Sequence, residues 1–163
     1  MKLDCQVRRN LETSLTEFLQ TETASTTVFF KGKNENIDIR VGFAPKDDWK
    51  MPVISIYMDT RTATRAFLGN NKRFKSYLMI IDVRALDDGM RSDLVELLTD
   101  TINDGFDLFN YSPNPSDPSN LIKVLSGRVS VEFVTDIPIR STENTNIYEK
   151  YRQNISVSLT IAV

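Results

Sequence analysis

The chain has 163 residues, the length of a single domain, and its 40% of hydrophobic and 26% of charged residues are ordinary for a soluble globular protein. Its net charge is −2, so it lacks the general excess of bases that marks a nucleic-acid-binding domain. It has no histidine, Cys5 is its only cysteine, and no glycine-rich phosphate-binding loop occurs. These features exclude an internal disulfide, a cysteine-based zinc site and the nucleophilic triads that need histidine. We therefore expect a protein that is not an enzyme and that needs no metal or other cofactor.

Near the N-terminus, apolar residues recur at steps of three and four and predict an amphipathic helix over about residues 3–20. These residues are Leu3, Val7, Leu11, Leu15, Phe18 and Leu19. The first ten residues mix acids with bases and contain no apolar core, so we expect no signal peptide. The most hydrophobic run, residues 77–81, is too short to span a bilayer.

The next part of the chain is predicted to form strands. Residues 28–30 and the alternating residues 37–43 are expected to form a hairpin, with residues 34–36 as its turn. Residues 53–58 (VISIYM) contain one polar residue in six, which is typical of a strand buried on both faces. Residues 77–83 predict a further strand.

Between these last two strands lies an acid-free segment, RTATRAFLGNNKRFK, which spans residues 61–75. Its bases are Arg61, Arg65, Lys72, Arg73 and Lys75. Because Gly69, Asn70 and Asn71 form a strong turn signal, we expect a hairpin with a cationic tip. Three uses fit this composition: a single-strand-binding surface with interleaved aromatic residues, a hairpin kept unpaired by its charges, or a docking surface for protein.

A second helix is predicted over about residues 90–110, after N-cap candidates at residues 87–89. Its expected apolar face consists of Leu94, Val95, Leu98, Ile102, Phe106 and Phe109. Five carboxylates at steps of three or four are expected on the opposite face: Asp93, Glu96, Asp100, Asp104 and Asp107. This acidic face is either ordinary solvated helix surface or a fixed surface that meets a cationic partner or repels a polyanion.

The C-terminal third is predicted to contain a loop and two strands. Residues 112–120 (SPNPSDPSN) hold three prolines and are expected to be a loop, while residues 129–134 and 155–161 alternate as strands. The element order is therefore α-β-β-β-β-α-β-β. We predict a single α+β domain over residues 1–163, with one mixed, mostly antiparallel β-sheet flanked by two main helices.

In this order of elements the chain resembles the tail terminator (tail completion) proteins of long-tailed bacteriophages. The resemblance covers most of the chain. It rests on the N-terminal helix, PVISIYM at residues 52–58, the turn at Leu68 and Gly69, RSDLVELL at residues 91–98, and the final alternating strand at residues 154–163. It implies a mixed sheet flanked by helices and a structural virion protein without catalytic activity or cofactor.

The resemblance also implies partners and a location. Such a protein forms a ring, expected to be hexameric, at the head-proximal end of the tail tube, where it ends tube polymerisation and provides the head–tail joining surface. Its partners are other copies of itself, the tail tube protein and a head-side connector or completion protein. DNA only passes through the channel, no membrane is involved, and the protein is in the host cytoplasm during virion assembly.

For the ring or tube contact we predict one set of residues, namely Arg61, Arg65, Asn70, Asn71, Lys72, Arg73 and Lys75. The acidic face is expected to meet a neighbouring subunit or to line the lumen. Two alternatives remain open at this point. One is another phage neck protein, such as a head–tail adaptor or a head-closure protein, and the other is a small module that binds single-stranded nucleic acid through residues 61–75.

Overall fold

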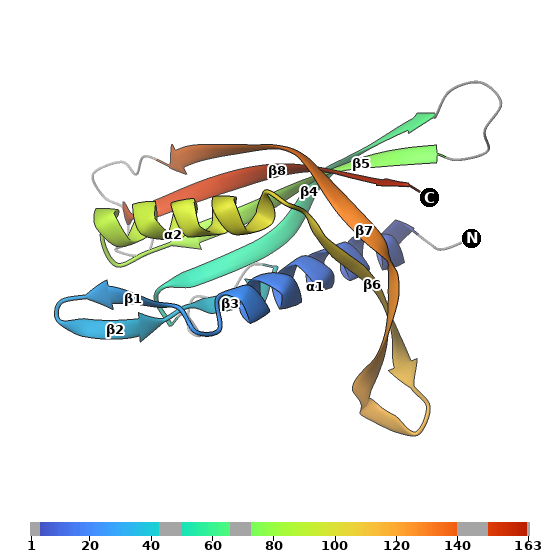
Figure 1. Ribbon diagram of the computed structural model, residues 1–163, viewed down its shortest axis with the longest axis horizontal. Coiled ribbons are helices and arrows are strands. Elements are labelled where there is room, and N and C mark those ends of the chain that lie inside the picture. Colours follow the sequence, from blue (N-terminus) through green and yellow to red (C-terminus); the bar gives the residue numbers. More distant parts are fainter. Residues whose placement is uncertain (1–3, 43–49, 66–72, 140–149, 163) are drawn as a thin grey trace.

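The computed structural model describes residues 4–42, 50–65, 73–139 and 150–162 (Figure 1). The elements in chain order are α1 (Asp4–Glu22), β1 (Thr27–Phe30), β2 (Lys33–Asn36), β3 (Asp38–Val41), β4 (Val53–Arg65), β5 (Arg73–Arg84), α2 (Asp88–Ile102), β6 (Phe106–Asn114), β7 (Asp117–Ile139) and β8 (Arg152–Ala162). Six strands form one sheet in the order β3-β4-β5-β8-β7-β6, while β1 and β2 form a separate hairpin. Within the described residues, β3 and β4 are the only neighbouring strands that pair in parallel. The predicted α+β class is confirmed, although there are two sheets and two more strands than expected.

One hydrophobic core contains the buried sides of both helices and of the central strands. Leu11 and Leu15 of α1 and Leu94 and Leu98 of α2 are fully buried in it. The alternating residues of β8 face this core through Ile155, Val157, Leu159 and Ile161, as the sequence pattern predicts.

The first hairpin differs from the prediction in its turn. Lys31 and Gly32 form a two-residue loop with positive φ angles of 47° and 82°, which is the geometry favoured in tight hairpins. Residues 34–36 therefore belong to strand β2 and are not the turn. The alternating residues that follow leave this hairpin, and β3 joins the main sheet beside β4.

The second helix is shorter than predicted. Asp87 caps its N-terminus by accepting a hydrogen bond from the amide of Met90 at 2.7 Å. The helix ends at Ile102, and Gly105 then adopts a φ of +77°, a left-handed conformation that glycine tolerates. Phe106 and Phe109, expected on the helix, lie in strand β6 instead. Their spacing from Ile102 fits a helical period, but the Asn-Asp-Gly sequence after Ile102 ends the helix before they are reached.

The proline-rich residues 112–120 are not a loop, which corrects the prediction. They form the end of the β6–β7 hairpin, where Pro113 pairs with Leu121 and Asn114 pairs with Asp117. Proline is tolerated here because β6 lies at the edge of the sheet.

Strand β7 has 23 residues and changes its partner midway. Residues 117–129 pair with β6, whereas residues 130–139 pair with β8. The β6–β7 hairpin therefore leaves the main sheet and projects beyond it, crossing α1 on the way (Figure 1). We call this hairpin, residues 106–129, the arm.

Helix α1 closely matches its predicted span, but several polar residues between its apolar positions are buried and contact strand edges. The amide of Met58 in β4 donates to Glu12 Oε1 at 2.9 Å. The amide of Phe109 in β6 donates to Ser14 Oγ at 3.0 Å, and that of Tyr111 donates to Asn10 Oδ1 at 3.4 Å. Helix α1 thus hydrogen-bonds strands that lie at opposite sides of the sheet.

Replacing Glu12 tests this role of α1. In Glu12→Ala the buried amide of Met58 loses its acceptor, so we expect the free energy of unfolding to fall by about 1–3 kcal/mol. Glu22→Ala is the matched control, because Glu22 is exposed at the end of the same helix and its removal should change stability by less than about 0.5 kcal/mol. Urea denaturation measures both, and equal midpoints for the two variants would show that the Glu12 contact is not structural.

Candidate docking surfaces

The predicted basic site lies on the β4–β5 hairpin, whose two strands pair as expected. Arg65 pairs with Arg73 and Ala63 pairs with Lys75. Since alternate residues of a strand share a face, Arg61, Arg65, Arg73 and Lys75 hold positions on one face of this hairpin. The other residues predicted for this site lie outside the described residues: Asn70, Asn71 and Lys72.

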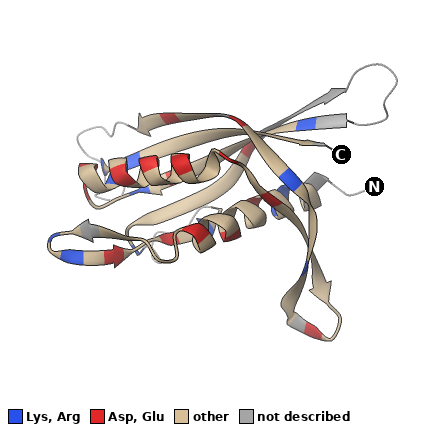
Figure 2. Cartoon of the chain, viewed as in Figure 1, with Lys and Arg blue, Asp and Glu red and all other residues tan. Residues whose placement is uncertain are grey.

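The five predicted carboxylates do not form one helix face, because the helix ends at Ile102. Figure 2 shows acidic positions following one another along α2, and these are the exposed Asp93, Glu96 and Asp100. Asp104 lies in the turn after the helix, and Asp107 lies on β6. Three of the five predicted carboxylates therefore lie on α2, which also carries the exposed Asp88 in its first turn.

The arm carries the largest group of exposed apolar side chains among the described residues. Four members of the run LIKVL are exposed, by 59%, 41%, 55% and 60% respectively: Leu121, Ile122, Val124 and Leu125. Exposed apolar groups of this size on a monomer indicate an interaction surface.

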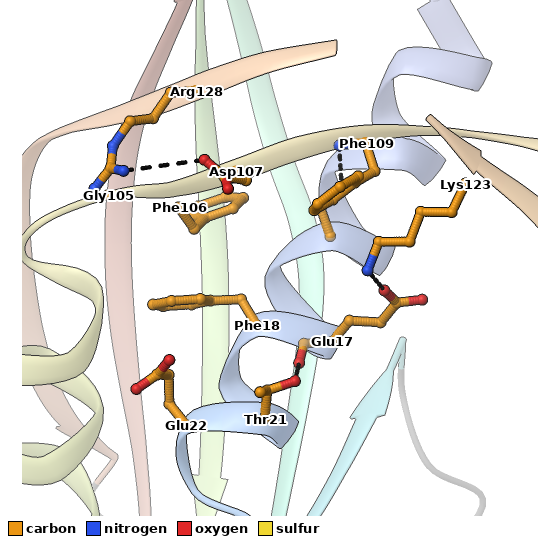
Figure 3. A pocket seen from close by; sticks show the side chains of 11 residues that line it. Glu17, Phe18, Thr21, Glu22, Gly105, Phe106, Asp107, Phe109, Lys123 and Arg128 are labelled. Atoms are coloured by element: carbon orange, nitrogen blue, oxygen red, sulfur yellow. Dashed lines mark hydrogen bonds and ion pairs between the residues drawn. The ribbon is translucent and has the colours of Figure 1, made fainter. Parts of the chain in front are cut away.

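A cleft of about 290 Å³ lies where the arm meets α1 (Figure 3). Phe18 of α1 stacks on Phe106 of β6 with 5.9 Å between the ring centroids. Lys123 reaches across from β7, pairs with Glu17 at 2.5 Å and lies 4.0 Å from the centroid of the Phe109 ring. These contacts fasten the base of the arm to α1.

Charged groups on the other side of this cleft connect the two strands of the arm. Arg128 Nη1 lies 4.0 Å from Asp107 Oδ1, and Arg128 Nη2 donates to the carbonyl oxygen of Asp104 at 2.9 Å. Burial raises the pKa of Tyr111 to about 12, so the phenol of this β6 residue stays neutral at physiological pH. The arm is therefore held by mixed charges and aromatic contacts.

A second cleft, of about 320 Å³, lies between α2 and the outer part of β7. Its acidic members are Glu96, Asp100 and Asp136, and the amide of Gln153 donates to Asp136 Oδ2 at 2.6 Å. This cleft brings the acidic surface of α2 next to the strand that continues the arm.

The arm is the feature that sequence reasoning missed. The signal was present in the apolar residues 121–125, which follow the proline-rich turn directly. Their alternation is interrupted by Lys123, and the helix expected over residues 90–110 left no preceding strand with which they could pair.

No family model fits the chain, and no curated protein matches it. Among the described residues, no helix is long and apolar enough to cross a membrane. The same part of the chain holds no group of three or more His, Cys, Asp or Glu residues arranged to bind a metal ion.

Gly105 lies in the turn between α2 and the arm, and we expect its replacement to lower the stability of the fold. A Cβ at this position would lie 2.3 Å from the carbonyl oxygen of Val129, and the φ of +77° strains other residues. We expect Gly105→Ala to lower the free energy of unfolding by about 1–3 kcal/mol from the backbone conformation alone.

Gly89→Ala is the control, because Gly89 is helical and its added Cβ would meet only Asp87 Oδ1, at 3.6 Å. This change should raise stability by about 0.4–1 kcal/mol. Thermal or urea unfolding distinguishes the two, and a neutral Gly105→Ala would contradict the tight turn described here.

Proposed function

We propose that this protein is a structural subunit that assembles into a ring at the head-proximal end of a phage tail tube, as a tail terminator does. In this role it ends tube polymerisation and presents a joining surface to the head-side connector. It acts without catalysis or cofactor, as part of the virion, and DNA passes through the ring.

The arm is the observation that carries this proposal. It extends an apolar surface beyond the core, through the exposed side chains of Leu121, Ile122, Val124 and Leu125. A monomeric protein gains nothing from such a surface, whereas a subunit of an assembly buries it against a partner. The arm is also anchored to α1, which holds it in a fixed direction.

The charges support repeated contacts between identical subunits. Basic positions gather on the β4–β5 hairpin and acidic side chains gather on α2, so one chain carries both members of a complementary pair. When complementary patches lie on different surfaces of one subunit, head-to-tail contacts form a ring if the rotation closes. Each exposed ion pair contributes only about 0–1 kcal/mol, but repetition around a ring sets register and partner choice.

Reversing the charge of the β4–β5 hairpin tests the proposal. We expect the triple variant Arg65→Glu, Lys72→Glu, Arg73→Glu to fold normally and to lose ring closure or tube docking. Light scattering should give about six times 18.6 kDa for the wild type, free or on the tube end, and the monomer mass for the variant.

A matched reversal at Arg9, Lys33 and Lys50 is the control, because these bases are exposed elsewhere on the surface. It should leave assembly unchanged. Fluorescence anisotropy with labelled single-stranded DNA completes the test. A triple variant that assembles normally and loses affinity for DNA would favour the nucleic-acid-binding alternative over the ring.

A further inference from the structure

Most strand edges near α1 are already hydrogen-bonded. Glu12 accepts from the amide of Met58 in β4, and Gln20 donates to the carbonyl oxygen of Ile39 in β3 at 2.9 Å. Ser14 and Asn10 accept from two amides of β6. An edge covered in this way does not recruit another strand.

Strand β7 differs, because each of its halves has one edge without a strand partner in the described part of the chain. Residues 117–129 pair with β6 alone, and residues 130–139 pair with β8 alone. The change of partner at residue 130 therefore leaves one free edge on the arm and another on the main sheet. We call them the arm edge and the sheet edge.

The arm edge is apolar, and its charged side chains from residue 118 onward are basic, although Lys123 is already paired with Glu17 of α1. Its regular part, residues 121–125, lies between two irregularities in register, one at Pro113 and Asn114 and the other at Leu108 and Phe109. No acid occurs from residue 118 to residue 131, whereas Lys123 and Arg128 are basic. Arg128 remains 64% exposed although it lies near Asp107.

The sheet edge is of similar length and opposite charge. Its regular part, residues 133–137, lies between the irregularity at Glu132 and Pro138. Residues 130–139 include two acids, Glu132 and Asp136, and no base. Glu96 and Asp100 of α2 line the cleft beside Asp136, and Ile137 is 56% exposed.

From these two edges we infer that the arm of one copy adds as a β-strand to the sheet edge of a second copy. Main-chain hydrogen bonds would join the two edges, as in other cases of strand addition, and the apolar side chains of the arm would become covered. The inference rests on the proposed ring of identical subunits and adds a main-chain contact between them, beside the charge contacts proposed above.

Pairing of the arm with the sheet edge of a second copy is favoured over pairing between the arms of two copies. Arm-to-arm pairing would bring together two strands whose charged residues after Asp117 are basic, whereas the sheet edge is acidic and similar in length to the arm edge. Because the arm and the sheet edge are different surfaces of one subunit, the contact is heterologous and can repeat from one copy to the next.

Two variants that each break one side of the contact test this inference. The arm variant is Leu121→Glu with Leu125→Glu, which places acids opposite the acidic sheet edge. The edge variant is Glu96→Lys, Asp100→Lys and Ile137→Lys, which places bases opposite the cationic arm. All five positions are exposed, so both variants should keep the circular dichroism spectrum of the wild type.

The expected result is that each variant alone has the monomer mass by light scattering, while a 1:1 mixture forms a dimer or a larger oligomer. In the mixture the intact sheet edge of the arm variant meets the intact arm of the edge variant, and the acidic arm and the basic edge of the two variants are complementary in charge as well. Ser112→Glu with Ser116→Glu is the control, because it adds the same charge to exposed positions on β6 and in the turn at the tip of the arm, and this variant should assemble like the wild type.

Other outcomes separate this inference from the proposed function. Rings formed by the arm variant, or a mixture that stays monomeric while the wild type forms rings, would overturn the inference and leave the ring proposal standing. Wild-type oligomers that need the arm but never bind a tail tube would overturn the function and leave the inference standing. A wild type that is monomeric both in solution and with tubes would overturn both.

Discussion

The polar side chains of α1 hold the strand edges of this fold. Asn10, Glu12 and Ser14 are buried and accept hydrogen bonds from backbone amides of β4 and β6, which lie far apart in the strand order. A backbone amide buried without an acceptor destabilises the folded state, so these contacts determine where the sheet can end and how the arm leaves it. The core stabilises the fold by burying apolar side chains, while the polar residues of α1 position the edges of β4 and β6.

The position of the arm follows from this constraint. Strand β7 continues past its partner β8, and its first half would be a bare hairpin without α1 beside β6. The ion pair between Lys123 and Glu17 and the stacking of Phe18 on Phe106 add contacts at its base. The fold thus fixes a hairpin whose outer half has exposed apolar side chains, and a fixed hairpin loses less conformational entropy on docking than a mobile one.

Local patterns in the sequence were sufficient for part of this structure. The spacing of Leu11, Leu15 and Leu19 predicted α1, and the alternation in β8 identified its buried face. The hairpin of β4 and β5 was also predicted from the turn signal between its strands. In contrast, Phe106 and Phe109 fit both a helical and an extended pattern, so the end of α2 and the existence of β6 depended on Gly105. The change of partner in β7 is set by contacts between residues far apart in sequence, as is the burial of Asn10 and Ser14. No local period encodes such contacts, and the arm was missed for this reason.

Residue-resolved hydrogen exchange tests the central claim most directly, namely that α1 covers the strand edges near it while the edges of β7 stay open for a second copy. In the dissociated protein the amides of Met58, Phe109 and Tyr111 should exchange slowly, and outward amides in residues 121–125 and 133–137 should exchange fast. On assembly, the latter two segments should become protected together. Fast exchange at Met58, Phe109 and Tyr111, or assembly that protects neither segment of β7, would contradict the account.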